Sequence, residues 1–412
     1  MEELNMETSL HDHTLSKNQK WTIASTSAGF ALENMDVMFL SFALSSIIAD
    51  LHISGAQAGL ISSITNLGML AGGLLFGIIA DRYGRVRTFS HTIFIFAFAT
   101  AAMCLANNIT LIYIFRFLAG VGAGGEYGVG ITLIAESFAR NKIGKMTSLA
   151  AVGGQVGAIL AAVAAALIIP VFGWQALFLF GLLPVGLTYF IRRHLHESPE
   201  FLTAKQAADH APVQLRRLFN TPRLAYQTLA LMLMVVVQIA GYFGLMNWLP
   251  AIMQQKLGLT VAGSSVWMIA TIIGMSIGML TFGSILDYFG PRRAFGIFLL
   301  ASAIAVFSIT LAVNQATLIL AGAIIGFFSN GMFGGYGAVI SRLYPTEIRS
   351  TANNLIVNVG RAIGGFSSVA IGWLMDHYTL TIVMAFLSIL YLVSFTVMLT
   401  IPNLRQFNKV NP

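Results

Sequence analysis

The chain has 412 residues, of which 57% are apolar and only 9% are charged. A soluble domain carries about 25% charged residues, so this composition excludes an ordinary water-soluble fold and indicates a protein embedded in lipid. The formal net charge is +7, and the chain has a single cysteine, which excludes an internal disulfide.

Residues 1–20 form a polar segment that lacks the apolar core of a cleaved signal peptide, and we interpret them as a cytoplasmic tail. Beyond them, about twelve apolar runs each approach the roughly 20 residues that a membrane-spanning helix needs. The predicted spans lie near residues 22–48, 56–80, 88–106, 110–137, 147–171, 174–191, 226–252, 264–286, 293–313, 316–343, 350–374 and 379–401. The sequence therefore predicts an all-α membrane protein.

One hydrophilic break is much longer than the others. Residues 192–225 are polar and charged, and we interpret them as a cytoplasmic linker between two six-helix bundles, residues 21–191 and 226–401, with a second tail at 402–412. Twenty of the 23 Lys and Arg residues fall on the side of both tails, whereas only Lys256 falls on the opposite side. This asymmetry follows the positive-inside rule and predicts two cytoplasmic termini, in a plasma (inner) membrane of bacterial type.

The two predicted bundles share a sequence repeat. Five residues recur 206 positions later: Gly68, Gly72, Gly77, Asp81 and Gly84 return as Gly274, Gly278, Gly283, Asp287 and Gly290. Duplicated halves that meet around a central site are typical of transporters. The repeat therefore predicts two pseudo-symmetric halves with a site between them.

A repeated motif follows the second predicted span of each half. The first copy reads Gly77-Ile-Ile-Ala-Asp81-Arg82-Tyr-Gly84-Arg85, and the second begins at Gly283 and lacks counterparts of Arg82 and Arg85. The motif closely resembles the signature loop of the major facilitator superfamily. The resemblance implies the twelve-helix major facilitator fold, with this loop latching the cytoplasmic side; the alternative is that its arginines only set topology. The implied gate residues are Gly77, Asp81, Arg82, Gly84, Arg85, Asp287, Arg292 and Glu136.

Three further stretches carry a narrower resemblance. They begin at Arg116 in the fourth predicted span, at Tyr242 in the seventh and at Asn358 in the eleventh. Together they resemble the proton-coupled organic-acid symporters, in particular the sialate and aromatic-acid groups. Aromatic-acid carriers usually have Asp-Gly-x-Asp in the first span, where this chain reads Glu33-Asn-Met-Asp36. The resemblance therefore implies an organic acid as cargo but does not identify it.

Five ionisable residues fall inside predicted spans: Glu33, Asp36, Arg116, Glu126 and Arg361. Each would cost about 2.5–3.5 kcal/mol at the bilayer centre on the insertion scale. Five such costs rival the whole net stability of a domain, which is about 5–15 kcal/mol. These side chains must therefore pair, face water or bind protons.

The acidic residues are candidates for proton coupling. Glu33 and Asp36 are three residues apart on one helix face, and their mutual repulsion favours protonation of one of them. The alternative is a structural pair that is hydrogen-bonded to Asn34 or to a neighbouring helix. We also assign Glu126 and Arg116 to proton transfer, with pairing between helices as the alternative.

Arg361 is the candidate that binds the substrate anion, because its planar fork matches a carboxylate. The alternative is a salt bridge to Asp36 or Glu126. The residue 206 positions before Arg361, its counterpart in the N-terminal half, is Gln155, so only one half carries the arginine. Polar and aromatic residues complete the predicted site, with packing as the alternative for each: Gln155, Tyr127, Gln238, Tyr242, Asn247, Trp248 and Asn358, together with Asn34 and Tyr336.

The sequence lacks the motifs that other functions would need. None of the eight histidines lies deep in a predicted span or has the spacing of a metal site, and no phosphate-binding Gly-rich loop with its lysine is present. We therefore expect neither an enzyme nor an ATP-driven pump, and no metal, cofactor or nucleic-acid partner. We expect proton-coupled uptake of a small organic anion across the lipid bilayer by alternating access, and the resemblance implies a monomer. The alternatives are a proton-coupled carrier of a neutral solute such as a sugar, and an efflux pump for hydrophobic compounds.

Overall fold

In the residues that it describes, the computed structural model consists of helices joined by short turns, without β-strands. These residues are 15–53, 55–195, 197, 201–203, 215–257, 261–367, 370–371, 374 and 377–404. The N-terminal half contains α2 (Lys17–Leu51), α3 (Gly55–Tyr83), α4 (Arg85–Ala102), η1 (Met103–Leu105), α5 (Ile109–Ser137), α6 (Ile143–Phe178), η2 (Leu179–Leu182) and α7 (Leu183–His194). The C-terminal half contains η3 (Leu215–Phe219), α9 (Pro222–Leu257), α10 (Val261–Phe289), α11 (Pro291–Ala305), α12 (Ser308–Leu311), α13 (Gln315–Ile325), η4 (Gly326–Asn330), α14 (Phe333–Leu343), η5 (Thr346–Ile348), α15 (Arg349–Gly364), α17 (Leu380–Thr400) and η6 (Pro402–Leu404).

The helices coincide with the predicted spans. Nine stretches of the described residues are long and apolar enough to cross a membrane. Of the other three predicted spans, the one near 22–48 lies within α2, and the one near 350–374 begins in α15. The span near 174–191 follows a bend at Gly173, where φ is +79°, and consists of the end of α6, the 3-10 turn η2 and α7.

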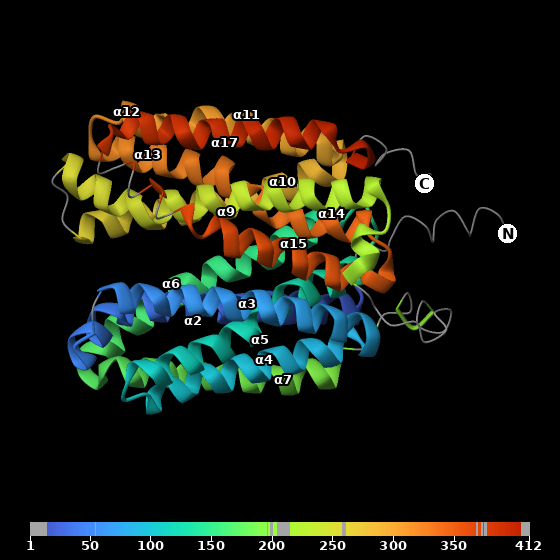
Figure 1. The fold of residues 1–412 in the computed structure, drawn as a ribbon, viewed down its shortest axis with the longest axis horizontal. Coiled ribbons are helices and arrows are strands. Elements are labelled where there is room, and N and C mark those ends of the chain that lie inside the picture. The colour runs from blue at the N-terminus through green and yellow to red at the C-terminus, as the bar shows by residue number, and fades with distance from the viewer. Residues whose placement is uncertain are drawn as a thin grey trace.

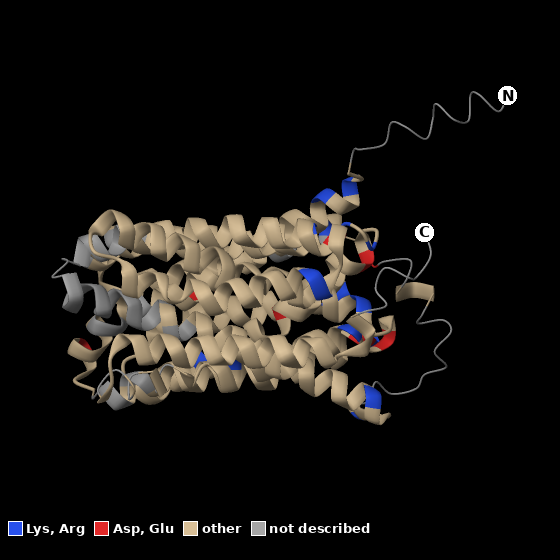
Figure 2. Ribbon diagram, turned by 90° about the horizontal axis from the view of Figure 1, so that it is seen from above, with Lys and Arg blue, Asp and Glu red and all other residues tan. Residues whose placement is uncertain are grey.

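The helices run along the long axis in two bundles (Figure 1). Helices α2 to α7 form one bundle and α9 to α17 the other, and they meet where α15 packs on α3 and α5 and where α6 packs on α10 and α14. The start of α2 and the end of α17 lie at the same end of the molecule, where Lys and Arg gather (Figure 2). We call this the basic end, and it matches the predicted asymmetry of positive charge.

Polar residues with short side chains lie between the apolar runs and cap the N-termini of several helices. The Ser16 hydroxyl accepts a hydrogen bond from the Gln19 N–H at 3.2 Å, while the Gln19 side chain accepts one from the Ser16 N–H at 3.0 Å. Asn108 likewise accepts from the Leu111 N–H at 2.9 Å and starts α5. These bonds satisfy N–H groups that have no partner within the helix.

Helices α3 and α5 approach closely because small residues line their contact. A Cβ atom on Gly72 would overlap the carbonyl group of Val121 on α5. Close backbone approach of this kind replaces the hydrophobic driving force that lipid removes. The glycines within the spans therefore belong to the packing that holds the N-terminal bundle together.

Substitution of Gly72 tests this packing. We expect Gly72→Ala to lower the melting temperature in detergent, because pushing the two backbones apart costs about 1–3 kcal/mol. Gly186→Ala is the matched control, since no described atom outside its own stretch of helix lies within 4 Å of the Cβ position there. Equal melting temperatures for Gly72→Ala and the wild type would contradict the close contact.

Candidate functional site

The repeated motif joins the two bundles at the basic end. Asp81, near the end of α3, accepts hydrogen bonds from the backbone N–H groups of Ser350 (3.1 Å) and Thr351 (2.8 Å) and from the Thr351 hydroxyl (2.7 Å). These N–H groups belong to the first turn of α15, where the helix dipole also favours a negative charge. The predicted gate acid thus caps a helix of the opposite half.

Arg85 extends this contact through a buried cluster of charges. Its guanidinium lies 3.2 Å from Asp81 and 3.1 Å from Glu136, and it donates to the Thr346 carbonyl at 2.5 Å. Arg349 adds a second cation 3.5 Å from Glu136. Two acids and two arginines therefore compensate one another, and both bundles contribute. The structure brings together three of the predicted gate residues here.

The second copy of the motif makes the same contact in the opposite direction. Asp287 accepts hydrogen bonds from the N–H groups of Gly144 (2.9 Å) and Lys145 (2.8 Å), in the first turn of α6. Gly144 and Lys145 precede Ser350 and Thr351 by the same 206 positions that separate the repeats. The two acids and the two helix ends form a twofold-symmetric latch, which we call the basic-end latch.

Arg342 supplies the cation that the second copy of the motif lacks. Pro291 stands at the counterpart of Arg85, and Arg342 instead forms the ion pair with Asp287. Arg342 occupies the repeat position of Glu136, so the charge at that position is reversed between the halves. Sequence reasoning did not assign Arg342, although the repeat offset could have identified it.

Glu197, which lies beside the latch, is a second residue that sequence reasoning missed. Its carboxylate accepts hydrogen bonds from the N–H groups of Arg85 (2.8 Å) and Val86 (3.0 Å) and so caps α4. Gly84 precedes them with φ at +126°, and a Cβ atom there would meet this carboxylate. The sequence feature that could have identified Glu197 is an acidic residue shortly after the sixth predicted span.

The remaining predicted gate residues lie around the latch. Gly77 allows α3 to approach α15, since a Cβ atom on it would lie 2.9 Å from the Cα atom of Thr351. Arg82 is exposed beside the Tyr83 ring, and Arg292 is half-buried near the start of α11. Of these three residues, only Gly77 contributes to the contact between the bundles.

Four of the five predicted charges inside the spans form two ion pairs. Arg116 Nη1 lies 2.9 Å from each carboxylate oxygen of Asp36, within the N-terminal half, and both side chains are buried. Arg361 Nη1 lies 2.8 Å from Glu33 Oε1 and joins α15 to α2 across the two halves. Arg361 is about 18 Å along α15 from Arg349, near the middle of a hydrocarbon core of about 30 Å.

These pairings agree only in part with the alternatives that the sequence suggested. Arg116 on α5 pairs with Asp36 on α2, which matches the alternative of pairing between helices, whereas Arg361 pairs with Glu33 rather than with Asp36 or Glu126. Glu33 and Asp36 belong to the same helix, but each has its own arginine. Repulsion between the two acids is therefore offset by their separate partners.

Glu126 is the fifth charge, and it is fully buried in α5. Neither of its carboxylate oxygens has a hydrogen-bond partner among the described residues. It lies near enough to Glu33 and Arg361 to interact electrostatically with both. Because an ionised carboxylate without a partner is costly in such a place, this acid is suited to hold and release a proton.

Aromatic and apolar side chains surround the Arg361–Glu33 pair. The Arg361 guanidinium lies 5.3 Å from the centroid of the Tyr127 ring, a cation–π distance. Its Nη1 atom lies 3.9 Å from the sulfur of Met69, and Tyr242 is within electrostatic reach. A charged centre with apolar walls suits a small, rigid anion.

Other predicted substrate-binding residues bond to the protein itself. Gln238 donates to the Ser329 carbonyl at 2.6 Å and to Asn330 at 3.1 Å, where η4 forms a short π-helix. The Tyr336 hydroxyl donates to a carbonyl of α9, and Asn358 donates to a carbonyl of α5. These side chains are buried, so the structure gives them packing roles in this conformation.

Two more candidates lie on the contact of α2 with α6. Asn34 donates to the Phe30 carbonyl at 3.2 Å and packs against α6 next to the half-buried Gln155. The side chains of Asn247 and Trp248 lie outside the described residues, so the predicted roles of these two residues stay predictions.

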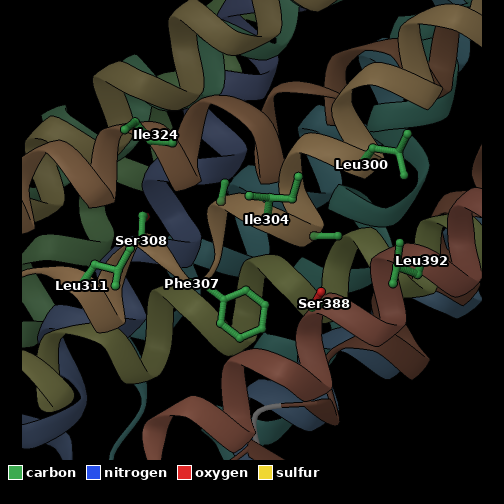
Figure 3. A pocket seen from close by; sticks show the side chains of 10 residues that line it. Leu300, Ile304, Phe307, Ser308, Leu311, Ile324, Ser388 and Leu392 are labelled. Carbon is green, nitrogen blue, oxygen red and sulfur yellow. The ribbon is translucent and has the colours of Figure 1, made fainter.

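A pocket of about 570 Å³ lies elsewhere, between α11, α12, α13 and α17 (Figure 3). Ile304 and Leu311, which line it, are 74% and 78% exposed, so it opens on the membrane-facing surface. None of its ten lining residues is ionisable, which does not suit an anion.

The described residues contain no group of three or more His, Cys, Asp or Glu side chains that could bind a metal ion.

Comparison with known proteins agrees with this architecture. The family model described as Major Facilitator Superfamily matches residues 26–281 and 231–411. A putative metabolite transport protein of Haemophilus influenzae is 36% identical over 375 residues, which cover 89% of this chain and 92% of that protein. A probable 4-methylmuconolactone transporter of Cupriavidus pinatubonensis is 31% identical, covering 88% and 85%. The sialic acid transporter NanX of Escherichia coli is 29% identical, covering 87% and 88%.

A solved structure has the same fold. The proton:xylose symporter XylE aligns with a TM-score of 0.81 over 94% of this chain and 97% of that one, at 18% sequence identity. The alignment extends over both bundles. The predicted fold class is therefore confirmed.

Removal of the Arg342 charge tests the basic-end latch. We expect Arg342→Gln to open this end, because breaking a buried ion pair costs about 3–5 kcal/mol. The readout is maleimide labelling in detergent of a cysteine placed at Ser148, which is buried between α6 and α14, in a Cys104→Ser background. Labelling should accelerate by at least roughly tenfold.

Arg293→Gln is the control, since Arg293 is exposed on neighbouring α11. Labelling of Arg342→Gln at the rate of this control would show that the arginine does not hold the latch closed.

Proposed function

The chain belongs to the Major Facilitator Superfamily, and on this premise we propose that it imports a small organic acid together with protons by alternating access. The cargo that we propose is an aromatic or sugar acid carried as its anion. The basic end is then the cytoplasmic face of a bacterial-type plasma membrane, and the monomer is the working unit.

One observation carries the proposal: Arg361 holds Glu33 at mid-depth, across the boundary between the halves. A guanidinium binds a carboxylate of a substrate as it binds one of the protein, so the anion competes with Glu33. The side chain of Arg361 is 15% exposed, against 4% for Glu33, which leaves the cation within reach of a ligand. A relative named for sialic acid transport also supports an acidic cargo.

Proton coupling follows from the charge balance of the site. With Arg361 engaged by Glu33, Glu126 has no cation of its own among the described residues, and it holds a proton. When the anion takes Arg361, Glu33 loses its partner and must take up a proton as well. Each bound anion therefore brings one proton with it, while Asp36 and Arg116 stay paired as a fixed support.

The anion site is tested by Arg361→Gln in proteoliposomes with an inward proton gradient and a panel of labelled aromatic acids, sialic acids, sugars and amines. We expect the apparent affinity for the transported acid to fall roughly tenfold to a hundredfold, since a charge-assisted hydrogen bond contributes about 1.5–3 kcal/mol. Arg293→Gln controls for a loss of positive charge outside the site. Uptake of a sugar or amine in place of any acid, or undiminished affinity in Arg361→Gln, would refute the proposed cargo.

Glu33→Gln separates coupling from transport. Because loading adds a proton, the affinity of the wild type should fall as pH rises, whereas the neutral glutamine should make affinity independent of pH. The variant should still exchange labelled for unlabelled acid but lose accumulation driven by the gradient. Asp50→Asn is the control, because Asp50 lies at the far end of the same helix and bonds to Trp174. Gradient-driven accumulation that survives in Glu33→Gln would exclude Glu33 as the coupling acid.

A further inference from the structure

Two asparagines of α15 reach into the backbone of α5. Asn354 Oδ1 accepts a hydrogen bond from the Gly128 N–H at 3.0 Å, and Asn358 Nδ2 donates to the Gly124 carbonyl at 2.9 Å. In an α-helix, the N–H of residue 128 bonds to the carbonyl of residue 124. The two side chains therefore engage both members of a single helical hydrogen bond, at one point on the opposite half.

The sequence of α5 makes this approach possible. A Cβ atom on Gly128 would lie 2.7 Å from the backbone nitrogen of Asn354, so only glycine admits α15 at this distance. Insertion of a side chain into a helical hydrogen-bond ladder is a recognised cause of helix bending. The contact therefore couples the position of α15 to the local geometry of α5 beside Glu126.

The asparagines lie between the two other contacts that α15 makes with the N-terminal half. Thr351, Asn354, Asn358 and Arg361 are spaced by three, four and three residues, so they lie on one face of the helix. Thr351 belongs to the basic-end latch, and Arg361 belongs to the proposed anion site. We call these four residues the polar face of α15.

At the repeat-related positions that the structure describes, the other bundle interface lacks such a contact. By the repeat offset, Asn354 and Gly128 correspond to Ser148 and Gly334, which also pack together. The Ser148 hydroxyl, however, has no hydrogen-bond partner among the described residues. The asparagine contact is thus specific to the bundle interface that carries Arg361.

The contact between α15 and α5 can also break at a small cost in free energy. Asn354 Nδ2 and Asn358 Oδ1, the opposite ends of the same amides, are buried without a partner in the described part of the chain. Burying such groups costs free energy that water would recover if the helices parted. The closed contact therefore contributes only about 1 kcal/mol for each hydrogen bond, which is small enough for a reversible contact.

We propose that Asn354 and Asn358 are positioning residues that clamp α15 on α5 in the state closed at the basic end, and that the clamp opens together with the latch when the site is loaded. The proposal rests on alternating access but not on the identity of the cargo. Loss of the clamp should shift the protein toward the state open at the basic end, even without substrate.

The test is a distance distribution by pulsed electron resonance between spin labels at positions 83 and 288, in a Cys104→Ser background without substrate. Tyr83 and Tyr288 lie at the ends of α3 and α10 and are 54% and 79% exposed. Asn354→Ala and Asn358→Ala should each raise the ratio of long to short distances by roughly fivefold, the equivalent of one buried hydrogen bond.

Asn353→Ala is the matched control. Asn353 is equally buried in α15, but its two hydrogen bonds, to Ser341 and to the Arg349 carbonyl, stay within the C-terminal half. Asn358 also donates to the Asn354 carbonyl, so Asn353→Ala loses as many hydrogen bonds as Asn358→Ala and one more than Asn354→Ala. It should nevertheless keep the wild-type distribution. Each single variant is read separately, so the test stands if the double variant does not fold. Unchanged distances in both single variants, or an equal shift in Asn353→Ala, would overturn the clamp.

Discussion

The constraint on which the rest of the structure depends is that an ionised side chain inside lipid needs an opposite charge or several hydrogen bonds. This chain meets much of that need between its halves rather than within them. Asp81 and Asp287 each cap a helix of the opposite bundle, and Arg361 reaches Glu33 across the interface. The two bundles are therefore held together by charged contacts, whose strength depends on the protonation of their acids.

Duplication accounts for the scaffold, and departures from it account for the chemistry. The latch keeps twofold symmetry, since each gate acid caps a helix of the opposite bundle at repeat-related positions. The deep charges break that symmetry, since Glu126 corresponds to Met332 and Arg361 corresponds to Gln155. If the cargo is a single small anion, as we propose, it occupies one site, so a cation at one of the two equivalent positions is enough. The reversed charge at Glu136 and Arg342 has another cause. Glu136 balances Arg85 in the first half, whereas the second half has Pro291 at that position and Arg342 supplies the cation for Asp287.

Features set by residues close together in the sequence could be predicted, whereas contacts between helices distant in the sequence could not. The spans and the gate acids follow from local patterns, namely apolar length, turn residues and the repeat. The pairing of Asp36 with Arg116 depends on how α2 is rotated against α5, which the spacing of residues along one helix does not determine. Gln238 looked like a cavity residue because it is polar within a span, but it bonds to η4, whose π-helical turn has no signature in the sequence.

The polar face of α15 combines two kinds of contact, and the difference between them matters for the cycle. Breaking a buried ion pair costs about 3–5 kcal/mol, whereas a neutral hydrogen bond contributes only about 1 kcal/mol net. A face made wholly of ion pairs would hold the bundles closed until every charge had found a new partner. Neutral amides at Asn354 and Asn358 keep the helices in register between Thr351 and Arg361 without adding that barrier. In the proposed cycle, Glu33 first releases Arg361 at mid-depth. The hydrogen bonds of Asn354 and Asn358 are weak enough to break next, so that the basic-end latch can open.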